Sequence, residues 1–396
     1  MIVRKIREEE FRRTLEVFSI AFEAELSPNA ASQEELTRIR TAPASRWERY
    51  WLERWAAFND QNGMMGFLLG FPANVRFDGH EAVCTCIGDV SCLPAYRRQG
   101  VIASCFRQHL ADSFEQGAVF SYLYPFSTVF YRQFGYELCA QTVEWRIDVD
   151  AIPAFPEIKG FASLNEAYSE REALAQIYRQ SMAEYNLSFL REDCDWNRFI
   201  GQQPAAQHRY TYVWRNADGV PKGCFTFGKE YDAQLRGSIM ICTDFHAVDD
   251  EGMKGLLQFI RSFRSHYKRV HLPMPVDVRL ERILPEVSSC ERRIGFTGMG
   301  RIINVRRALE LARYQGSGTV NIAVADPQVD QNNGIFKVNF QDGRCTDITA
   351  GTHADVSLDI AAFSRLLLGG CSPEEYARTP LAAVFYPKRM YISDFF

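Results

Sequence analysis

The first third of the chain alternates between helical and strand-like spacing of its apolar positions. Apolar residues at helical spacing predict a helix over residues 8–25. Two strands are predicted over residues 64–75 and 81–90, and the intervening Asp78-Gly79 is typical of a hairpin turn. Aromatic residues between the helix and the hairpin also repeat at helical spacing, which indicates the wall of a core or pocket: Trp47, Tyr50, Trp51, Trp55 and Phe58.

The rest of the chain divides into two further segments. Residues 152–156 have the prolines of a linker and open a second α/β stretch that runs to Leu284. A third segment begins near Pro285 and ends at Phe396. Its predicted strands cover residues 318–326, 334–339, 347–348 and 354–359, and its predicted helices cover residues 360–368 and 373–377. We therefore expect an α/β (α+β) protein whose domains span residues 1–149, 150–285 and 286–396.

Composition and charge agree with a globular protein of several domains. The 396 residues are too many for one ordinary core, and 46% are hydrophobic and 24% charged. The net charge of −4 and a pI near 6.0 leave no basic footprint for nucleic acid. The first residues lack the apolar region of a signal peptide, and no apolar run approaches the length of a membrane span. We expect a cytoplasmic protein that binds neither nucleic acid nor membrane.

The 11 cysteines lie within apolar segments, as Cys139, Cys224 and Cys242 do. Their odd number and their setting favour buried free thiols in a reducing compartment over disulfides. Cys84 and Cys86 stand two positions apart on one face of a predicted strand, which is not the spacing of a zinc pair. No His or Cys cluster completes a metal site, so we expect no metal.

The segment from Val90 to Ala103 carries the most informative pattern. A strand is predicted to end near Leu93, and an amphipathic helix is predicted to begin near Gly100. Such a turn directs backbone N–H groups and the positive end of the helix dipole at one point, which suits a pyrophosphate. Gly100 lets phosphates approach the backbone, and Arg97 and Arg98 supply charged donors.

This strand–turn–helix arrangement resembles the coenzyme A-binding motif of the GNAT superfamily of N-acetyltransferases. The resemblance implies acetyl-CoA as the cosubstrate, with its pantetheine arm paired to the backbone of Val90, Ser91 and Cys92. Ile102 stands where the family often has Gly or Ala. The implied pyrophosphate loop comprises Arg97, Arg98, Gln99, Gly100, Val101, Ile102 and Ala103.

The stretch 130–136, Phe-Tyr-Arg-Gln-Phe-Gly-Tyr, resembles the GNAT segment in which a tyrosine stands beside the thioester sulfur. A strand is predicted over residues 122–127, Ser127 suits a helix N-cap, and Gly135 suits the C′ position. The resemblance makes Tyr131 the candidate general acid for the departing thiolate. The alternatives are a packed structural tyrosine at this position, or Tyr136 as the acid. The resemblance also assigns Phe126 and Ser127 to the coenzyme site.

The middle segment has a corresponding strand at residues 239–243, but the turn after it contains Asp249, Asp250 and Glu251. Three acidic side chains would repel a pyrophosphate. We interpret this segment as a degenerate GNAT-like fold that does not hold the coenzyme.

One GNAT unit with an intact loop, a second without one, and a C-terminal module that ends in phenylalanine together resemble the enhanced intracellular survival (Eis) family. The resemblance covers essentially the full chain and implies a sterol carrier protein-like last domain, aminoglycoside-type acceptors and a homohexamer. It also implies that the C-terminal carboxylate, here on Phe396, acts as general base in the first domain. The alternative is that this aromatic tail only fills a hydrophobic core and has no catalytic role. Glu23, Glu25 and Asp394 either attract a cationic substrate or are ordinary solvated acids.

We therefore expect acetyl transfer from acetyl-CoA to a primary amine of a cationic small molecule by direct attack. Two alternatives stay open: a protein acetyltransferase that modifies lysine, and a non-enzymatic lipid-binding protein that uses the C-terminal domain. A cysteine nucleophile at Cys92 or Cys105 ranks low, because only His109 stands near enough in sequence to activate it.

Overall fold

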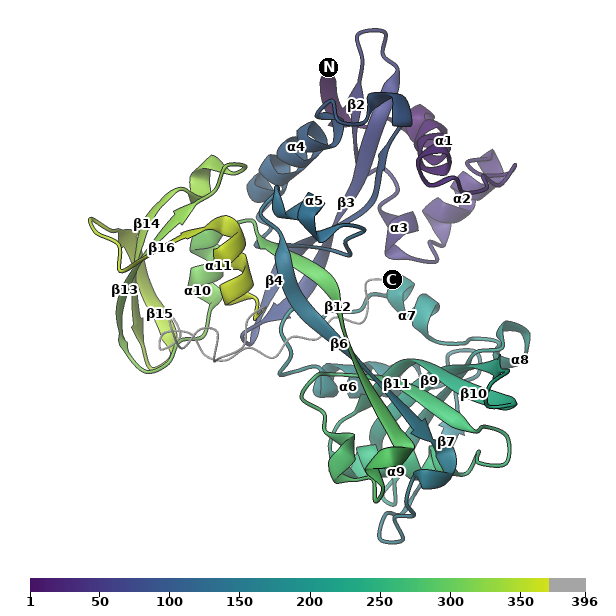
Figure 1. The fold of residues 1–396 in the computed structure, drawn as a ribbon. Coiled ribbons are helices and arrows are strands. Elements are labelled where there is room, and N and C mark those ends of the chain that lie inside the picture. The colour runs from purple at the N-terminus through teal and green to yellow at the C-terminus, as the bar shows by residue number, and fades with distance from the viewer. Residues whose placement is uncertain (370–396) are drawn as a thin grey trace. The chain divides into compact units, whose positions relative to one another are not determined.

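The computed structural model describes residues 1–369, which form two compact units (Figure 1). One unit comprises Met1–Ala140 and the described residues from Thr297 onward, and the other comprises Gln141–Phe296. Two strands, β6 (Glu137–Asp148) and β12 (Cys290–Ile302), begin in one unit and end in the other.

The first unit contains a sheet with the strand order β1-β2-β3-β4-β5-β12. Neighbouring strands are antiparallel except β4 and β5, which are parallel. The strands are β1 (Ile2–Lys5), β2 (Arg54–Phe58), β3 (Met64–Phe77), β4 (His80–Cys92), β5 (Phe120–Leu123) and the end of β12. The helices packed with them are α1 (Phe11–Phe22), α2 (Gln33–Thr41), α3 (Arg46–Arg49), α4 (Val101–Glu115) and α5 (Thr128–Arg132).

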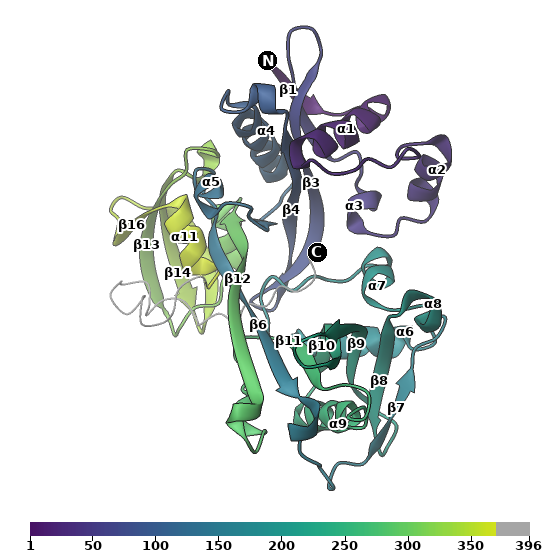
Figure 2. The same cartoon turned by 45° about the vertical axis from the view of Figure 1, so that its right-hand side comes forward.

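Helices α1 and α4 cover opposite faces of this sheet, as Figures 1 and 2 show. The sequence explains this arrangement, because alternate residues of one strand point to opposite faces. Trp55 and Ala57 of β2 join the apolar cluster that includes α4, whereas Ala56 and Phe58 join the cluster that includes α1. All five residues of β2 are therefore buried.

The prediction of a helical aromatic stripe is wrong for its second half. Trp47 lies in the short helix α3, but Trp55 and Phe58 lie in β2, between β1 and β3. Spacings of three and four residues across a helix, a turn and a strand imitate one helix, and burial on both faces of β2 produced its continuous apolar run. The helix predicted over residues 8–25 ends earlier than expected, at Phe22. It consists of a 3₁₀ turn at Glu8–Glu10 followed by α1.

The predicted hairpin is confirmed. Strands β3 and β4 pair antiparallel up to Phe77 and His80, and the two turn residues both have positive φ, 48° at Asp78 and 86° at Gly79. These values are those of a type I′ turn, whose twist matches that of the strands it joins.

A second, four-stranded sheet in the first unit confirms the strands predicted late in the chain. Its order is β15-β14-β13-β16, and β13 and β16 are parallel. Its elements are β13 (Gly318–Ala325), β14 (Gly334–Gln341), β15 (Arg344–Ala350) and β16 (Val356–Asp359), with α10 (Val305–Leu311) and α11 (Ile360–Leu367). β12 and α10 were not predicted, and the predicted helix over residues 373–377 lies outside the described residues.

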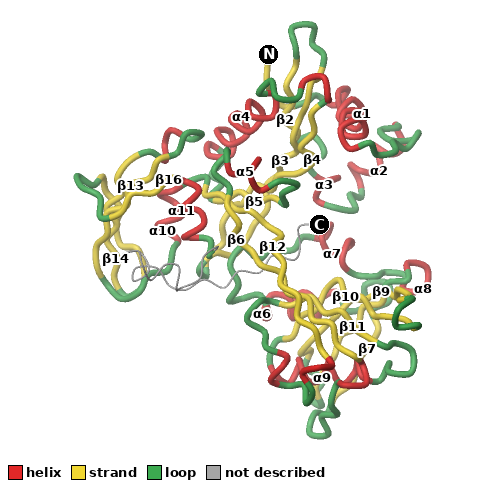
Figure 3. Tube along the Cα trace, in the orientation of Figure 1, coloured by secondary structure: helices red, strands yellow, loops and turns green. Residues whose placement is uncertain are grey.

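The second unit repeats the α/β plan of the first. Its strand order is β6-β11-β10-β9-β8-β7, and β10 and β11 form the parallel pair. Figure 3 shows strands in yellow and helices in red, here and in the first unit. Its strands are β7 (Gly160–Leu164), β8 (Tyr210–Asn216), β9 (Pro221–Asp232), β10 (Gly237–Ala247) and β11 (Arg269–Met274). Its helices are α6 (Arg171–Ser181), α7 (Asp193–Phe199), α8 (Pro204–Gln207) and α9 (Asp250–Arg261).

Candidate active site

Strands β4 and β5 of the first unit separate at their carboxyl ends. Their parallel pairing runs only from Cys84 with Phe120 to Ile87 with Leu123, although β4 continues to Cys92. On its other side β4 carries a bulge, since its pairing with β3 is interrupted between Gly88 and Ser91. The backbone around Val90 is thereby released from both neighbouring strands, which leaves N–H and C=O groups for a ligand.

Side chains of β2, β4 and the α3 segment hold this bulge in place. Asp89 has a left-handed φ of 50°, and its carboxylate accepts a hydrogen bond of 3.1 Å from the buried guanidinium of Arg54. The ring of Trp47 lies directly against Gly88, where an added Cβ would approach it to 1.9 Å. The opening between the strands is therefore a fixed feature of the fold.

The chain turns at the end of β4 so that the first turn of α4 faces the same opening. Arg98 and Gly100 have left-handed φ angles of 63° and 76°, and α4 begins at Val101. Gly100 is the N-cap and provides no side-chain acceptor, whereas Ser32 and Ser127 cap α2 and α5 with their hydroxyls. The first N–H groups of α4 therefore have no capping side chain and can bind an anion.

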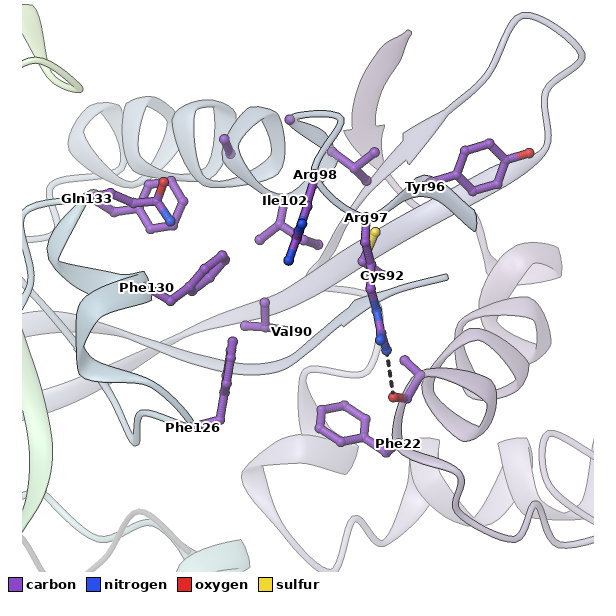
Figure 4. Close-up of a pocket in the computed structure, with 15 residues that line it drawn as sticks. Phe22, Val90, Cys92, Tyr96, Arg97, Arg98, Ile102, Phe126, Phe130 and Gln133 are labelled. Carbon is purple, nitrogen blue, oxygen red and sulfur yellow. Dashed lines mark hydrogen bonds between the residues drawn. The ribbon is translucent and has the colours of Figure 1, made fainter. Parts of the chain in front are cut away.

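A cavity of about 690 Å³ lies between these elements (Figure 4). The two cations of its wall, Arg97 and Arg98, stand at the α4 end, and the Arg97 guanidinium donates a hydrogen bond of 3.3 Å to the Ala21 carbonyl. Apart from them the wall is mostly apolar. The lining residues are Ala21, Phe22, Val90, Cys92, Tyr96, Arg97, Arg98, Gly100, Val101, Ile102, Ala103, Phe126, Phe130, Gln133 and Phe134. Such a cavity suits a ligand with phosphates at one end and an uncharged arm at the other.

Most of the residues that the sequence assigned to the coenzyme line this cavity, but three do not. Ser91 is buried, and its hydroxyl donates to the Asp89 carbonyl. The side-chain amide of Gln99 donates to the Ala95 carbonyl, and the Ser127 hydroxyl caps α5 by accepting from the Phe130 N–H.

Tyr131 adjoins the cavity but is not among the residues that line it. Its side chain is 3% exposed, and its ring makes edge contacts with Phe106, Phe126 and Phe130, of which the last two line the cavity. Among the described residues its hydroxyl has no hydrogen-bond partner. Burial raises the pKa of Tyr131 well above its ordinary value, so that its phenol keeps its proton at neutral pH.

Tyr136 differs from Tyr131 because its hydroxyl is engaged. It is fully buried and forms a hydrogen bond of 2.6 Å with Ser121 Oγ. Tyr136 therefore reads as a structural residue that fastens the end of the α5 segment to β5.

The cysteines near the cavity are poor nucleophiles. Burial raises the pKa of the Cys105 thiol to about 12, and burial likewise raises the pKa of Cys92. His109 contacts the hydroxyls of Thr85 and Ser113, at 3.0 and 3.2 Å, and burial lowers its pKa to about 3. A cysteine mechanism would need a thiolate and an available base, and these groups provide neither.

Several lining residues escaped the sequence analysis, among them Phe22, Phe130 and Phe134. Phe130 and Phe134 are four positions apart, and that spacing was the available signal that they share a face of the α5 segment. Phe22 is exposed at the end of α1, and only the folded chain brings it to the cavity (Figure 4).

The corresponding turn of the second unit has the opposite character. Asp249 caps α9, because its carboxylate accepts from the Gly252 N–H at 2.9 Å and also pairs with Lys222 Nζ at 2.6 Å. Burial alone would raise the pKa of Asp249, but the hydrogen bonds from Lys222 and Gly252 outweigh it and hold the pKa below its usual range. The helix terminus that a pyrophosphate would need is thus already occupied by a carboxylate.

A buried charge network fills the strand stretch beyond the β10–β11 pairing. Arg191 forms two hydrogen bonds, of 2.8 and 2.9 Å, with the carboxylate of Asp244, which also contacts His246 Nε2 at 2.7 Å. Burial favours the neutral acid, yet the charges of Arg191 and His246 keep the pKa of Asp244 well below its usual range. In the first unit the equivalent stretch lines the cavity instead.

Models of known protein families match segments of both units. A model of the acetyltransferase (GNAT) domain matches residues 2–139, and another matches residues 187–302. A model of the sterol carrier protein domain matches residues 305–382. The chain belongs to the GNAT N-acetyltransferases. Its two GNAT domains and sterol carrier protein domain give it the Eis-like architecture that the sequence predicted, and the family implies the use of acetyl-CoA.

Similar proteins occur in several bacteria. Uncharacterized N-acetyltransferases of Streptomyces griseus and Streptomyces avermitilis are 22% and 24% identical; the alignments cover 74% and 76% of this chain and 73% and 75% of theirs. Similar solved structures include a probable N-acyltransferase from Enterococcus faecalis V583 (TM-score 0.83, 21% identity, 99% of each chain). Eis1 from Mycobacterium abscessus is similar with a TM-score of 0.79, 21% identity and coverage of 99% of each chain. These structures share the fold of this chain.

The remaining predictions concern the chain end, metal binding, the cysteines and membrane spans. Phe396 and Asp394 lie outside them. Within residues 1–369 no group of three or more His, Cys, Asp or Glu side chains could hold a metal ion, and the cysteines are free, most of them buried. None of the helices described is long and apolar enough to cross a membrane.

Proposed function

We propose that this protein transfers the acetyl group of acetyl-CoA to a primary amine of a cationic small molecule by direct attack. The observation that carries the proposal is the uncapped start of α4, flanked by Arg97 and Arg98 at one end of an otherwise apolar cavity. Acetyl-CoA supplies the activated thioester, and the second GNAT domain, whose helix start is capped by Asp249, does not bind it.

The residues of the first GNAT domain would hold the coenzyme in three ways. The edge of β4 at Val90, Ser91 and Cys92, which lies beyond the pairing with β5, offers its backbone to the amides of the pantetheine arm. The loop from Arg97 to Ala103, which includes Gln99, Gly100, Val101 and Ile102, holds the pyrophosphate by N–H groups and guanidinium charge. Phe126, together with the backbone at Ser127, closes the apolar end.

Two proton carriers complete the proposed site. Tyr131 donates a proton to the sulfur that departs, and its raised pKa guarantees that the proton is present. A phenol with a raised pKa is a weaker acid than a thiol, so Tyr131 stabilises the developing thiolate chiefly by donating a hydrogen bond to it. The C-terminal carboxylate of Phe396 removes the proton of the ammonium substrate. A carboxylate of ordinary pKa, about 3.3–3.7, is a weak base and needs burial or a bridging water for this role.

The remaining parts of the proposal concern organisation. We assign coenzyme binding to residues 1–149, a degenerate GNAT-like role to 150–285, and delivery of the C-terminus to 286–396. The free buried thiols support a reducing compartment such as the cytoplasm, and the Eis-like architecture supports a homohexamer. The exposed carboxylates of Glu23 and Glu25, just beyond the cavity-lining end of α1, favour a cationic acceptor such as an aminoglycoside or a polyamine.

The test is an assay of coenzyme A release from acetyl-CoA with aminoglycosides, polyamines and lysine-containing peptides as acceptors. We expect turnover with the small polyamines and aminoglycosides. Turnover with peptides alone would indicate a protein acetyltransferase. Silence with every acceptor, combined with uptake of a fluorescent fatty acid by the full chain, would indicate the lipid-binding alternative.

A further inference from the structure

A fully buried arginine stands where the sterol carrier protein domain meets the catalytic segment of the first GNAT domain. Arg301 belongs to the end of β12, pairs with Ser121 of β5, and is 0% exposed. Its guanidinium donates one hydrogen bond, of 2.5 Å, to the Phe134 carbonyl and another, of 2.6 Å, to the Asp326 carboxylate. One side chain thus connects both domains.

The Asp326 end of this link is rigid. Asp326 directly follows β13, is 2% exposed, and accepts hydrogen bonds from the side chain of Asn332 at 2.8 Å and from the Gln328 N–H at 2.9 Å. Asn332 in turn accepts from the Val305 N–H at 2.9 Å, where α10 begins. The carboxylate is therefore held by several contacts within the sterol carrier protein domain besides the one to Arg301.

The Phe134 end of the link leads directly to Tyr131. The Phe134 N–H donates to the Tyr131 carbonyl at 3.0 Å, and the Phe134 ring lines the cavity and stacks on Phe106. Gly135 follows with a φ of 81°, and a Cβ there would lie 2.2 Å from Arg301 Nη1. The guanidinium is therefore seated tightly against the turn that ends the α5 segment.

The energetics argue that this contact does more than stabilise the fold. Removing two charges from water costs about as much as a buried ion pair returns, and an apolar contact of the same volume often stabilises a junction at least as well. What the guanidinium adds is direction, because its planar fork fixes two acceptors at once. Five-residue α5 has little stability of its own, so its orientation depends on such contacts.

We propose that Arg301 is a positioning residue, through which the sterol carrier protein domain holds Tyr131 in its catalytic orientation. This inference rests on the proposed role of Tyr131. It gives the C-terminal domain a function in catalysis that is independent of the chain end and of any lipid.

The test compares variants of the full chain by kcat, by KM for acetyl-CoA and by the ¹⁹F spectrum of 3-fluorotyrosine placed at position 131. The double variant Arg301→Met/Asp326→Asn removes both charges and keeps an acceptor for Asn332, so that no lone charge is buried. Arg301→Lys keeps the charge but loses the fork. Arg191→Lys is the matched control, because Arg191 is equally buried and also forms a two-bond pair with a buried aspartate, but in the second unit.

We expect both Arg301 variants to fold and to bind acetyl-CoA as the wild type does. Their kcat should fall about 10- to 100-fold with little change in KM, as a displacement of about 1 Å at a catalytic group would cause. Their ¹⁹F signal should shift, while Arg191→Lys keeps both the rate and the signal.

An unchanged ¹⁹F signal in the Arg301 variants would overturn the inference, and so would a shifted signal with an unchanged kcat in an enzyme that Tyr131→Phe impairs. If Tyr131→Phe keeps the full rate, the proposed acid is wrong instead, and the ¹⁹F signal alone then decides whether Arg301 orients this tyrosine.

Discussion

Replacing Gly100 with aspartate would give α4 of the first domain the carboxylate N-cap that α9 has in the second domain. Asp249 occupies the start of α9 with its own carboxylate, whereas Gly100 leaves the start of α4 without a side-chain cap. An added Cβ at Gly100 meets no atom within 4 Å, so that only the left-handed φ of 76° opposes a side chain. Aspartate and asparagine tolerate this region better than most residues, at a cost of about 1 kcal/mol.

The expected loss of affinity follows from the charges involved. A unit charge about 5 Å from another contributes about 0.8 kcal/mol in water and about 3 kcal/mol at an effective dielectric constant of 20. Gly100 is exposed, which favours the lower figure, but the pyrophosphate carries two charges. We therefore expect Gly100→Asp to weaken acetyl-CoA binding by about 1.5–3 kcal/mol relative to Gly100→Asn, or about 10- to 100-fold.

Isothermal titration of both variants with acetyl-CoA gives this difference directly. Asparagine has the shape of aspartate and the same backbone strain, so the difference between the two isolates the charge. It should shrink in 1 M salt, where the screening length is about 3 Å. Equal affinities of the two variants at low salt would refute the assignment of this turn to the pyrophosphate.

Three further predictions concern the proton carriers and a buried histidine. Tyr131→Phe should lower kcat by about 100-fold or more while calorimetry shows unchanged coenzyme affinity, and a full rate would exclude it as the acid. A short Gly-Ser extension after Phe396 should abolish turnover without altering coenzyme binding or the melting temperature, and an active extended form would exclude the terminal carboxylate as base. His109 has its pKa lowered to about 3 by burial, below the ordinary 6.5, so the stability that it contributes is present above pH 6.5 and is lost as the pH falls toward 3. His109→Gln should therefore flatten the fall in unfolding free energy between pH 6.5 and 4.5, by about 1.4 kcal/mol per pH unit in urea titrations, and an unchanged slope would contradict this reading.

The parts of the structure that depend on local sequence were predictable. Asp78-Gly79 specifies its turn by backbone preference alone, and the strand–turn–helix at Gly100 follows from neighbouring residues. The aromatic residues around Trp55 misled the prediction, because the burial of a strand on both faces removes the alternation that identifies strands.

The parts that depend on distant segments were not predictable. Phe22 reaches the cavity only because α1 packs against β4 in the folded chain, and the two are some 70 residues apart in the sequence. From the sequence alone Arg301 is expected at the surface, since buried charges are rare. Only the folded structure shows that Asp326 is its partner. The pairing of Arg191 with Asp244 in the second unit, 53 residues apart in the sequence, belongs to the same class.

The stoichiometry of acetyl-CoA binding to the intact wild-type protein tests the central claim most directly. If the open start of α4 is the coenzyme site and the capped start of α9 is not, calorimetry should find one acetyl-CoA bound per chain. Two molecules per chain, or none, would contradict it.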